Sequence, residues 1–283
     1  MTPGGEPGES VVTVDGVSFS YEGGFEALVG VSMRVRRGEY IAIAGGNGSG
    51  KTTLAKHING LLHPSVGRVT TCGMRTDETS VANLARKVGY VFQNPDHQLF
   101  CTTVEEEVRF GLENMDFEES ESAPKAQAAM ELVDIVALRD RPPFTLSLGD
   151  RRKVTIASVL AAEPEILVLD EPTTGLDHHD SEHLMSTLRA LNRSGRTIVL
   201  ISHDMRLVAE HVDRAVLMAA GRILVDADVG AVFSDLELLR EAKLVAPPIT
   251  QVAHRLAPLG VSPSTFTPSQ LVQQIEVLRG GGG

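Results

Sequence analysis

The segment Ala44–Thr53 has the residue types and spacing of a phosphate-binding loop. It reads Ala44-Gly45-Gly46-Asn47-Gly48-Ser49-Gly50-Lys51-Thr52-Thr53 and fits the pattern G-x-x-x-x-G-K-[ST]. Glycines let backbone N–H groups turn towards phosphate oxygens, and a helix that follows adds partial positive charge at its N-terminus. Lys51 is expected to reach the β- and γ-phosphates, and Thr52 to offer its hydroxyl to Mg²⁺. The alternative is a glycine-rich turn without a ligand, which the Lys-Thr pair disfavours. We therefore expect a nucleoside triphosphate as ligand.

Two carboxylates follow the apolar run Ile166–Leu169, which has the character of a buried strand. Ligands of open α/β sheets bind at the carboxyl ends of such strands. Asp170 is expected to hold Mg²⁺ through its water shell, and Glu171 to act as general base on the attacking water. A strand that ends in two acidic residues by chance is the alternative, and the phosphate loop upstream disfavours it.

Two more polar side chains come at predicted strand ends. Gln93 follows Val91-Phe92, and its amide could contact both the metal and the attacking water. His203 follows Leu200-Ile201-Ser202, and a neutral imidazole there could donate a hydrogen bond to the γ-phosphate. Single residues of these types are more often surface residues, so the assignment depends on the whole set.

The segment Leu146–Asp150 precedes a long predicted helix over 151–162. Ser147 as N-cap and Gly149 as a close-approach residue would form a second anion-binding helix start. A capped helix without a ligand is the alternative.

The surrounding elements are those of an α/β protein. Strand patterns at 11–14, 17–21 and 29–36 predict an antiparallel layer ahead of the strand 40–44. Helical spacing from about 102 to 160 predicts an inserted helical subdomain. Apolar runs at 166–170 and 197–201 alternate with helices at 180–192 and 205–211, which indicates a mostly parallel sheet.

Four ranges follow from this pattern. Residues 1–10 are rich in Gly, Pro and Glu and are expected to be disordered, and 11–226 form the main domain. Short helices broken by Pro247-Pro248 and Pro263 predict a helical extension over 227–279. The glycines of 280–283 predict a flexible tail.

Composition excludes several classes of protein. The chain has 283 residues and a net charge of −11, which argues against a nucleic-acid binder. No run of 18 apolar residues is present, and residues 1–10 lack the features of a signal peptide. Cys72 and Cys101 form neither a disulfide framework nor a C-x-x-C pair. Together these features predict a cytosolic location.

Taken in chain order, these motifs resemble those of an ATP-binding subunit of the ABC transporter family over residues 11–226. The resemblance implies a P-loop NTPase core with an antiparallel β subdomain, a helical subdomain and a C-terminal extension. It implies that two such domains face each other head to tail, so that Ser147 and Gly149 contact the ATP bound by the partner. Tyr21 matches the residue that stacks on adenine, and Asp177 lies in the loop along the dimer interface. His179 and His183 are spaced for a metal site, but a solvated helix face is the better interpretation.

The signature departs from the family form L-S-G-G-Q at two positions. Leu148 replaces a glycine and Asp150 replaces a glutamine. The added side chain and charge are expected to reduce activity at that half-site without abolishing it.

The segment Gly89–Phe100 and the L-S-L-G form, followed by Arg-Arg-Lys-Val, resemble the energy-coupling-factor group of vitamin and transition-metal importers, including cobalt and nickel systems. The resemblance implies a partner ATPase, either a copy or a relative. It also implies a transmembrane coupling subunit, a substrate-binding membrane subunit and a place on the cytoplasmic face of the membrane. Asp96 lies where it could receive basic residues of a coupling helix, or it caps a helix.

Two other classes remain as alternatives. A soluble ABC mechano-ATPase would carry two cassettes or a long coiled-coil insertion, and a small-molecule kinase would have no use for the signature or for Tyr21. The sequence therefore favours an ATP hydrolase that drives transport through a separate membrane protein.

Overall fold

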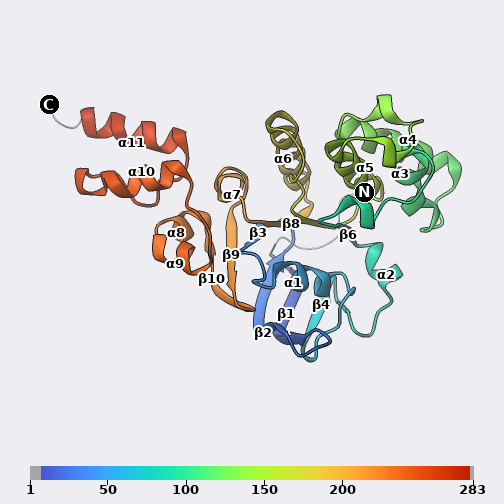
Figure 1. The fold of residues 1–283 in the computed structure, drawn as a ribbon, viewed down its shortest axis with the longest axis horizontal. Coiled ribbons are helices and arrows are strands. Elements are labelled where there is room, and N and C mark those ends of the chain that lie inside the picture. The colour runs from blue at the N-terminus through green and yellow to red at the C-terminus, as the bar shows by residue number, and fades with distance from the viewer. Residues whose placement is uncertain (1–7, 281–283) are drawn as a thin grey trace.

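Residues 8–280 are described by the structure, a computed structural model, and they form two sheets with helices around them (Figure 1). One sheet has the order β2-β1-β4-β5 and is antiparallel, and the other has the order β10-β9-β3-β8-β7-β6. The strands are β1 (Ser10–Ser20), β2 (Glu26–Arg36), β3 (Tyr40–Ala44), β4 (Val66–Thr71), β5 (Met74–Arg75), β6 (Val88–Val91), β7 (Ile166–Asp170), β8 (Thr197–Ser202), β9 (Arg214–Ala219) and β10 (Arg222–Asp228).

The helices fall into three groups: those that pack on the sheets, those of a helical region between β6 and β7, and those after β10. The α-helices are α1 (Lys51–Ile58), α2 (Val81–Ala85), α3 (Val104–Glu113), α4 (Glu119–Leu132), α5 (Leu148–Ala161), α6 (His178–Arg193), α7 (Met205–His211), α8 (Val229–Phe233), α9 (Leu236–Glu241), α10 (Pro248–Leu256) and α11 (Pro268–Gly280). Short 3₁₀ turns are η1 (Pro95–His97), η2 (Val136–Leu138), η3 (Pro143–Thr145) and η4 (Ala257–Leu259).

The larger sheet is buried on both faces, which explains its continuous apolar strands. Strands β3, β6, β7, β8 and β9 run parallel, and β10 pairs antiparallel with β9. In β3 every residue is buried: Ile41 and Ile43 belong to one apolar cluster, and Tyr40, Ala42 and Ala44 to the other. This alternation places one face of β3 towards the antiparallel sheet and the other towards the helices.

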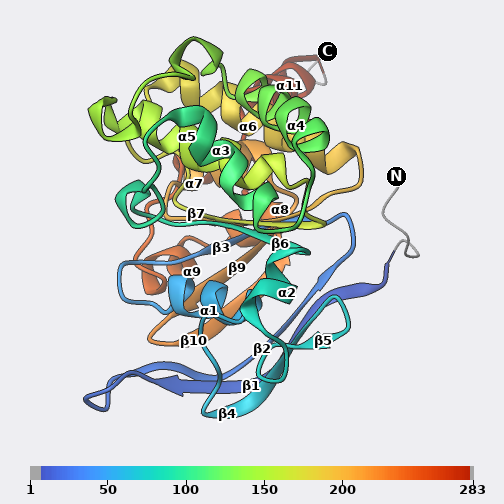
Figure 2. The same cartoon turned by 90° about the vertical axis from the view of Figure 1, so that its right-hand side faces the viewer.

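Helix α1 packs between the two sheets, as Figure 2 shows. Its buried residues Leu54, Ala55 and Ile58 join the cluster that includes Val31 and Val35 of β2. Because α1 is wedged in this layer, the loop that precedes it is fixed at the carboxyl end of β3.

The predicted α/β class is confirmed, and the bounds of several elements differ from the prediction, among them the first and last strands. β1 runs through the two segments predicted separately and begins at Ser10, which pairs with Arg36 and therefore is not part of a disordered segment. β10 continues two residues beyond 226 because Ala227 and Asp228 pair with Ala215 and Arg214. The predictions for residues 1–7 and 281–283 lie outside the described residues.

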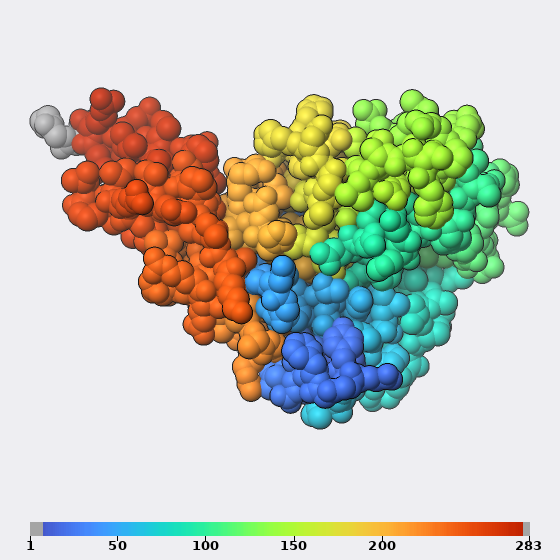
Figure 3. Space-filling model, viewed as in Figure 1, coloured from blue at the N-terminus to red at the C-terminus, as the bar shows by residue number. Residues whose placement is uncertain are grey.

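The helices after β10 project from the edge of the larger sheet where β9 and β10 lie (Figures 1 and 3). Val229, Val232 and Phe233 of α8 and Leu239 of α9 are buried in the larger apolar cluster. The first part of the extension is therefore packed on the main domain. Within residues 8–280 no helix has the length and apolar character needed to cross a lipid bilayer.

Candidate functional site

The phosphate loop Gly45–Gly50 connects β3 to α1, and its glycines are required by close neighbours. A Cβ on Gly45 would lie 2.3 Å from the carbonyl oxygen of Met218, and one on Gly50 would lie 2.5 Å from that of Ala27. Gly50 also has φ +102° at the N-cap of α1. No residue with a side chain fits these two positions, so the loop keeps its tight path at the sheet edge.

Lys51 lies at the start of α1 with its amine folded over the loop. Its Nζ donates hydrogen bonds to the carbonyl oxygens of Gly45 at 2.8 Å and Gly46 at 3.0 Å. Burial lowers the pKa of Lys51, while the carboxylates of Glu171 and Asp170 act in the opposite direction. The amine is therefore a buried donor that could exchange loop carbonyls for phosphate oxygens.

Two of the three residues predicted to bind Mg²⁺, Thr52 and Asp170, lie side by side. Thr52 Oγ1 donates to Asp170 Oδ2 at 2.7 Å, and Tyr90 Oη lies 3.4 Å from the same oxygen. The other oxygen, Asp170 Oδ1, is buried and has no hydrogen-bond partner. Burial raises the pKa of Asp170, against the hydrogen bonds from Thr52 and Tyr90. A buried carboxylate oxygen without a partner, beside a hydroxyl, fits the oxygen ligands that Mg²⁺ prefers.

Glu171 and His203 form a pair at the ends of adjacent parallel strands. His203 Nδ1 lies 2.6 Å from Glu171 Oε1, and β7 pairs with β8. Glu171 has φ +49°, a left-handed conformation that costs energy for a side chain of this type, and its N–H donates to Ile201 O at 2.9 Å. The carboxylate is buried and the imidazole is 61% exposed, so His203 lies on the solvent side of Glu171.

Ser147 is the N-cap of α5, and its hydroxyl is engaged twice by Asp150. Ser147 Oγ accepts from Asp150 N at 3.1 Å and donates to Asp150 Oδ2 at 2.8 Å. Leu148 is 43% exposed, and a Cβ on Gly175 would lie 2.8 Å from its Cγ. Gly149 packs against the same loop, because a Cβ there would lie 3.0 Å from Gly175 O. Of the two departures from the usual signature, Asp150 therefore bonds to the Ser147 hydroxyl. Leu148 packs against the Thr174–Asp177 loop.

Comparison with known proteins decides the family. A family model described as ABC transporter matches residues 28–174, which include the phosphate loop, the signature helix start and the Asp170-Glu171 pair. The chain belongs to the ABC transporter family. The ABC ATPase fold predicted from the motifs is thereby confirmed.

Relatives of this ABC protein include two curated sequences and a solved structure. An ABC transporter ATP-binding protein of Caldanaerobacter subterraneus is 41% identical over 249 residues, which are 88% of this chain and 44% of the relative. The energy-coupling factor transporter ATP-binding protein EcfA of Methanothermobacter thermautotrophicus is 39% identical over 246 residues, 86% of this chain and 79% of the relative. The chain spans less than half the length of the first of these relatives.

The similar solved structure is that of cbiO1 from Clostridium perfringens, part of the ABC transporter complex cbiONQ. It has a TM-score of 0.72 and 35% identity, and the match covers 89% of this chain and 98% of that one. The resemblance to the energy-coupling-factor group is confirmed by this neighbour and by EcfA.

Tyr21 of the ABC domain lies beside the phosphate loop. Its hydroxyl is 3.1 Å from Thr53 Oγ1 in the first turn of α1, and its ring packs edge-to-face on Phe19 with centroids 5.0 Å apart. The ring is partly exposed, so its open face is accessible for stacking.

Gln93 is placed differently from the other predicted residues. Its side chain is exposed and makes no hydrogen bond with any described residue, Thr52 and Asp170 included. The main chain here is held by Arg152 of α5, which is 1% exposed and donates to the carbonyl oxygens of Phe92, at 2.6 Å, and Gln93. Sequence reasoning missed Arg152 because a charged residue in a helix gives no signal of burial.

Two other predicted residues, Asp177 and Asp96, are bonded within the chain. Asp177 is the N-cap of α6 and accepts from Asp180 N at 2.8 Å. Asp96 accepts from Arg151 Nη1 at 2.6 Å, so its carboxylate already has a basic partner in the same chain.

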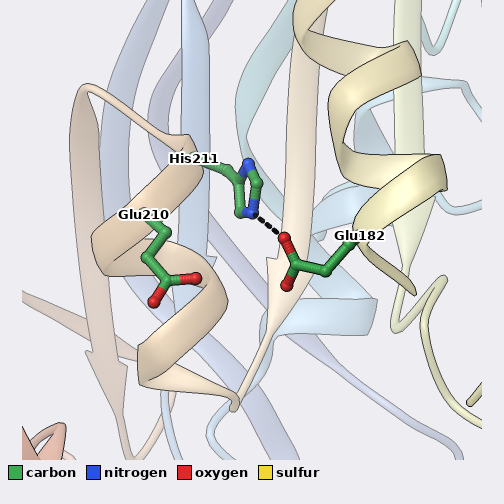
Figure 4. A group of neighbouring side chains, drawn as sticks. All are labelled: Glu182, Glu210 and His211. Atoms are coloured by element: carbon green, nitrogen blue, oxygen red, sulfur yellow. Dashed lines mark ion pairs between the residues drawn. The ribbon is translucent and has the colours of Figure 1, made fainter. Parts of the chain in front are cut away.

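The histidines of α6 do not form a metal site with each other in the described residues. The group that meets metal-ligand spacing is Glu182, Glu210 and His211, shown in Figure 4. Arg206 Nη1 lies 3.0 Å from Glu182 Oε1 and 3.3 Å from Glu210 Oε2, which supplies the positive charge. This cluster is therefore an ion-pair network that joins α6 to α7.

Proposed function

We propose that this chain binds and hydrolyses ATP to drive import of a solute through a separate transmembrane protein, at the cytoplasmic face of the membrane. The observation that carries the proposal is the convergence of Thr52, Asp170, Glu171 and His203 at one sheet edge beside the phosphate loop. Thr52 and Asp170 could bind a metal ion, and Glu171 with His203 could activate a water molecule. The two pairs at one sheet edge suit phosphoryl transfer to water.

In the proposed reaction the loop amides and Lys51 bind the phosphates of ATP, and Tyr21 stacks on adenine. The residues proposed to surround the phosphates are 45–53. Thr52 and Asp170 would hold Mg²⁺, with Gln93 as a further ligand, and the ion would neutralise phosphate charge when bound. Glu171 accepts a proton from the water that attacks the γ-phosphate in line, and His203 donates a hydrogen bond to the γ-phosphate.

Ser147 and Gly149 are proposed to serve the nucleotide of a second ABC ATPase, either a copy of this chain or a relative. Support comes from their position at the start of α5, where Ser147 is exposed, and from the packing of α5 against α3 and α4. A helix start with a serine cap offers donors to a phosphate. We further propose residues 11–226 as the nucleotide-binding domain, 102–160 as its helical subdomain and 227–279 as an accessory extension.

The proposed solute is a vitamin or a transition-metal ion such as cobalt or nickel, held by a substrate-binding membrane subunit. The names of the EcfA and cbiO1 relatives support an energy-coupling-factor type importer. No nucleic acid is involved in this proposal, and the net charge of −11 agrees with that.

A groove between the larger sheet and the helical subdomain is proposed to receive a helix of the transmembrane coupling subunit. It has a volume of about 270 Å³ and a mainly apolar lining, which includes Val81, Tyr90, Phe92, Phe100 and Phe110. The rings of Phe100 and Phe110 pack edge-to-face 4.5 Å apart and are both exposed. An exposed apolar groove of this kind marks an interaction site.

The test is purification of the complex from native membranes, with wild type, Phe100→Asp and Phe144→Asp as tagged bait. Phe100 is 57% exposed in the groove and Phe144 is 56% exposed outside it, so the pair is matched in exposure. We expect a membrane protein to co-purify with wild type and Phe144→Asp and to be lost with Phe100→Asp. Recovery of no membrane protein with wild type would contradict the transport function, and equal recovery with both variants would contradict the groove.

A further inference from the structure

The C-terminal extension contacts the phosphate loop through its backbone. Gly46 N donates a hydrogen bond of 2.7 Å to the carbonyl oxygen of Ala242, the residue that follows α9. A Cβ on Gly46 would lie 2.8 Å from Lys243 Cβ and 3.4 Å from Ala242 O. Gly46 does not have a left-handed φ, so the neighbouring extension, and not the backbone conformation, requires glycine here.

The end of α9 holds the Ala242 carbonyl firmly. Lys243 has φ +56°, and the amides of Ala242 and Leu244 donate to Leu238 O at 3.0 Å and Leu239 O at 2.8 Å. This is a left-handed helix end whose last carbonyl is free to accept an external donor. Leu239, Ala242 and Leu244 are buried in the larger apolar cluster, so the carbonyl cannot move without disturbing that packing.

Gly46 is also part of the loop's own turn. Ser49 N donates to Gly46 O at 3.2 Å, and Lys51 Nζ donates to the same oxygen at 3.0 Å. Gly46 is thus bonded at its N–H by the extension and at its carbonyl by the loop and the lysine. A shift of the extension at Ala242 would move a peptide unit on which the loop turn and Lys51 both depend.

We propose that Ala242 and Lys243 form a positioning element for the phosphate loop, so that nucleotide affinity depends on the docked state of the C-terminal extension. The inference rests on nucleotide binding at this loop. By linkage, a nucleotide that orders the loop also strengthens the docking of the extension, because the coupling between two equilibria is reciprocal. Neither residue needs to touch the nucleotide, since both act through Gly46.

The test is a steric rescue in the full chain, with the dissociation constant of Mg-ATP and the melting temperature measured for each variant. Gly46→Ala places a methyl group against Lys243 Cβ and is expected to weaken affinity about tenfold, as overpacking of a rigid contact does. Lys243→Gly removes that Cβ and suits the left-handed φ, and its affinity alone is the reference for the double variant. The double variant Gly46→Ala, Lys243→Gly is expected to recover affinity to within about twofold of wild type.

Lys243→Ala is the matched control, because it removes the long charged side chain and keeps the Cβ. Combined with Gly46→Ala it should not restore affinity. Slower amide exchange in residues 238–252 of wild type with Mg-ATP is the second expected result. Equal affinity of Gly46→Ala and the Gly46→Ala, Lys243→Gly variant, or rescue by Lys243→Ala, overturns the proposal. Failure of wild type to bind Mg-ATP would instead contradict the proposed function.

Discussion

The buried position of Asp170 suits a metal ligand but lowers the stability of the folded chain. Its Oδ1 is buried without a partner, and burial raises its pKa above the ordinary value of 3.8. A raised folded-state pKa means that Asp170 favours folding below pH 3.8, where it is protonated in both states. That contribution is lost as pH rises through the folded-state pKa, so at neutral pH the buried charge destabilises the fold.

Replacing Asp170 with asparagine should therefore stabilise the protein while it removes the proposed ligand of Mg²⁺. We expect the melting temperature of the Asp170→Asn variant at pH 7 to rise by about 2–4 °C, the shift that corresponds to about 1 kcal/mol in a domain of this size. The gain over wild type should shrink as pH falls through the folded-state pKa of Asp170. Binding of Mg-ATP should weaken in the same variant. A melting temperature below that of wild type at pH 7 would contradict the account.

Leu148 and Asp150 modify the signature at the residue scale. Asp150 accepts a hydrogen bond from the Ser147 hydroxyl, which would otherwise be free to donate to a phosphate oxygen, and Leu148 adds an exposed side chain at the helix start. We expect Leu148→Gly to raise the steady-state rate of ATP hydrolysis about two- to fivefold, the range of a helix-terminus interaction with an anion. Leu148→Ala should fall between wild type and Leu148→Gly. A rate of phosphate release by Leu148→Gly equal to that of wild type would show that Leu148 does not weaken this half-site.

The residues that could be predicted from the sequence are those whose type and local spacing carry chemistry: Lys51, Thr52, Asp170, Glu171 and His203. Parallel strands that end at one sheet edge brought them together as expected. Arg152 and Ala242 could not be predicted, because each acts through a hydrogen bond to a backbone atom distant in the sequence. Such contacts leave no pattern in residue types.

At the scale of elements, strands were more predictable than their pairing. Apolar runs identified β3, β7 and β8, but the position of β3 between β8 and β9 depends on long-range register that local patterns do not encode. The continuous β1 has its register interrupted between Val14 and Val17, where Gly16 has φ +60°, and this interruption explains why the sequence suggested two strands.

The start of α5 contacts the loop Thr174–Asp177 through Leu148 and Gly175. Gly175 has φ +88°, and a Cβ there would lie 2.8 Å from Leu148 Cγ, whereas Gly38 has φ +77° and nothing within 4 Å of its Cβ position. Gly38→Ala therefore measures only the free-energy cost of placing a side chain at a left-handed φ. We expect Gly175→Ala to lower the free energy of unfolding by about 1 kcal/mol more than Gly38→Ala does, because of the added overpacking.

Denaturant unfolding of the single variants and of Gly175→Ala with Leu148→Gly checks this prediction. The excess cost should disappear when Leu148 is glycine. Equal costs at positions 175 and 38 would show that Leu148 does not press on this loop.

At the scale of the whole molecule, we propose that the α1 layer and the helical subdomain contribute to different nucleotide sites. Glu171 and His203 lie at the same sheet edge as the phosphate loop, while Ser147 is the N-cap of α5, which packs against α3 and α4. Ser147 is therefore proposed to serve a nucleotide held by another subunit.

The most direct test compares Ser147→Asp with Ser147→Asn in the assembly purified from membranes. Both side chains cap a helix N-terminus well, so α5 should stay folded in each, but only aspartate adds a negative charge facing the partner's γ-phosphate. We expect Ser147→Asp to lose Mg-ATP hydrolysis while its own phosphate loop still binds ATP, and Ser147→Asn to keep most of the rate. Hydrolysis by Ser147→Asp at the rate of Ser147→Asn would contradict a role of Ser147 at the partner's nucleotide.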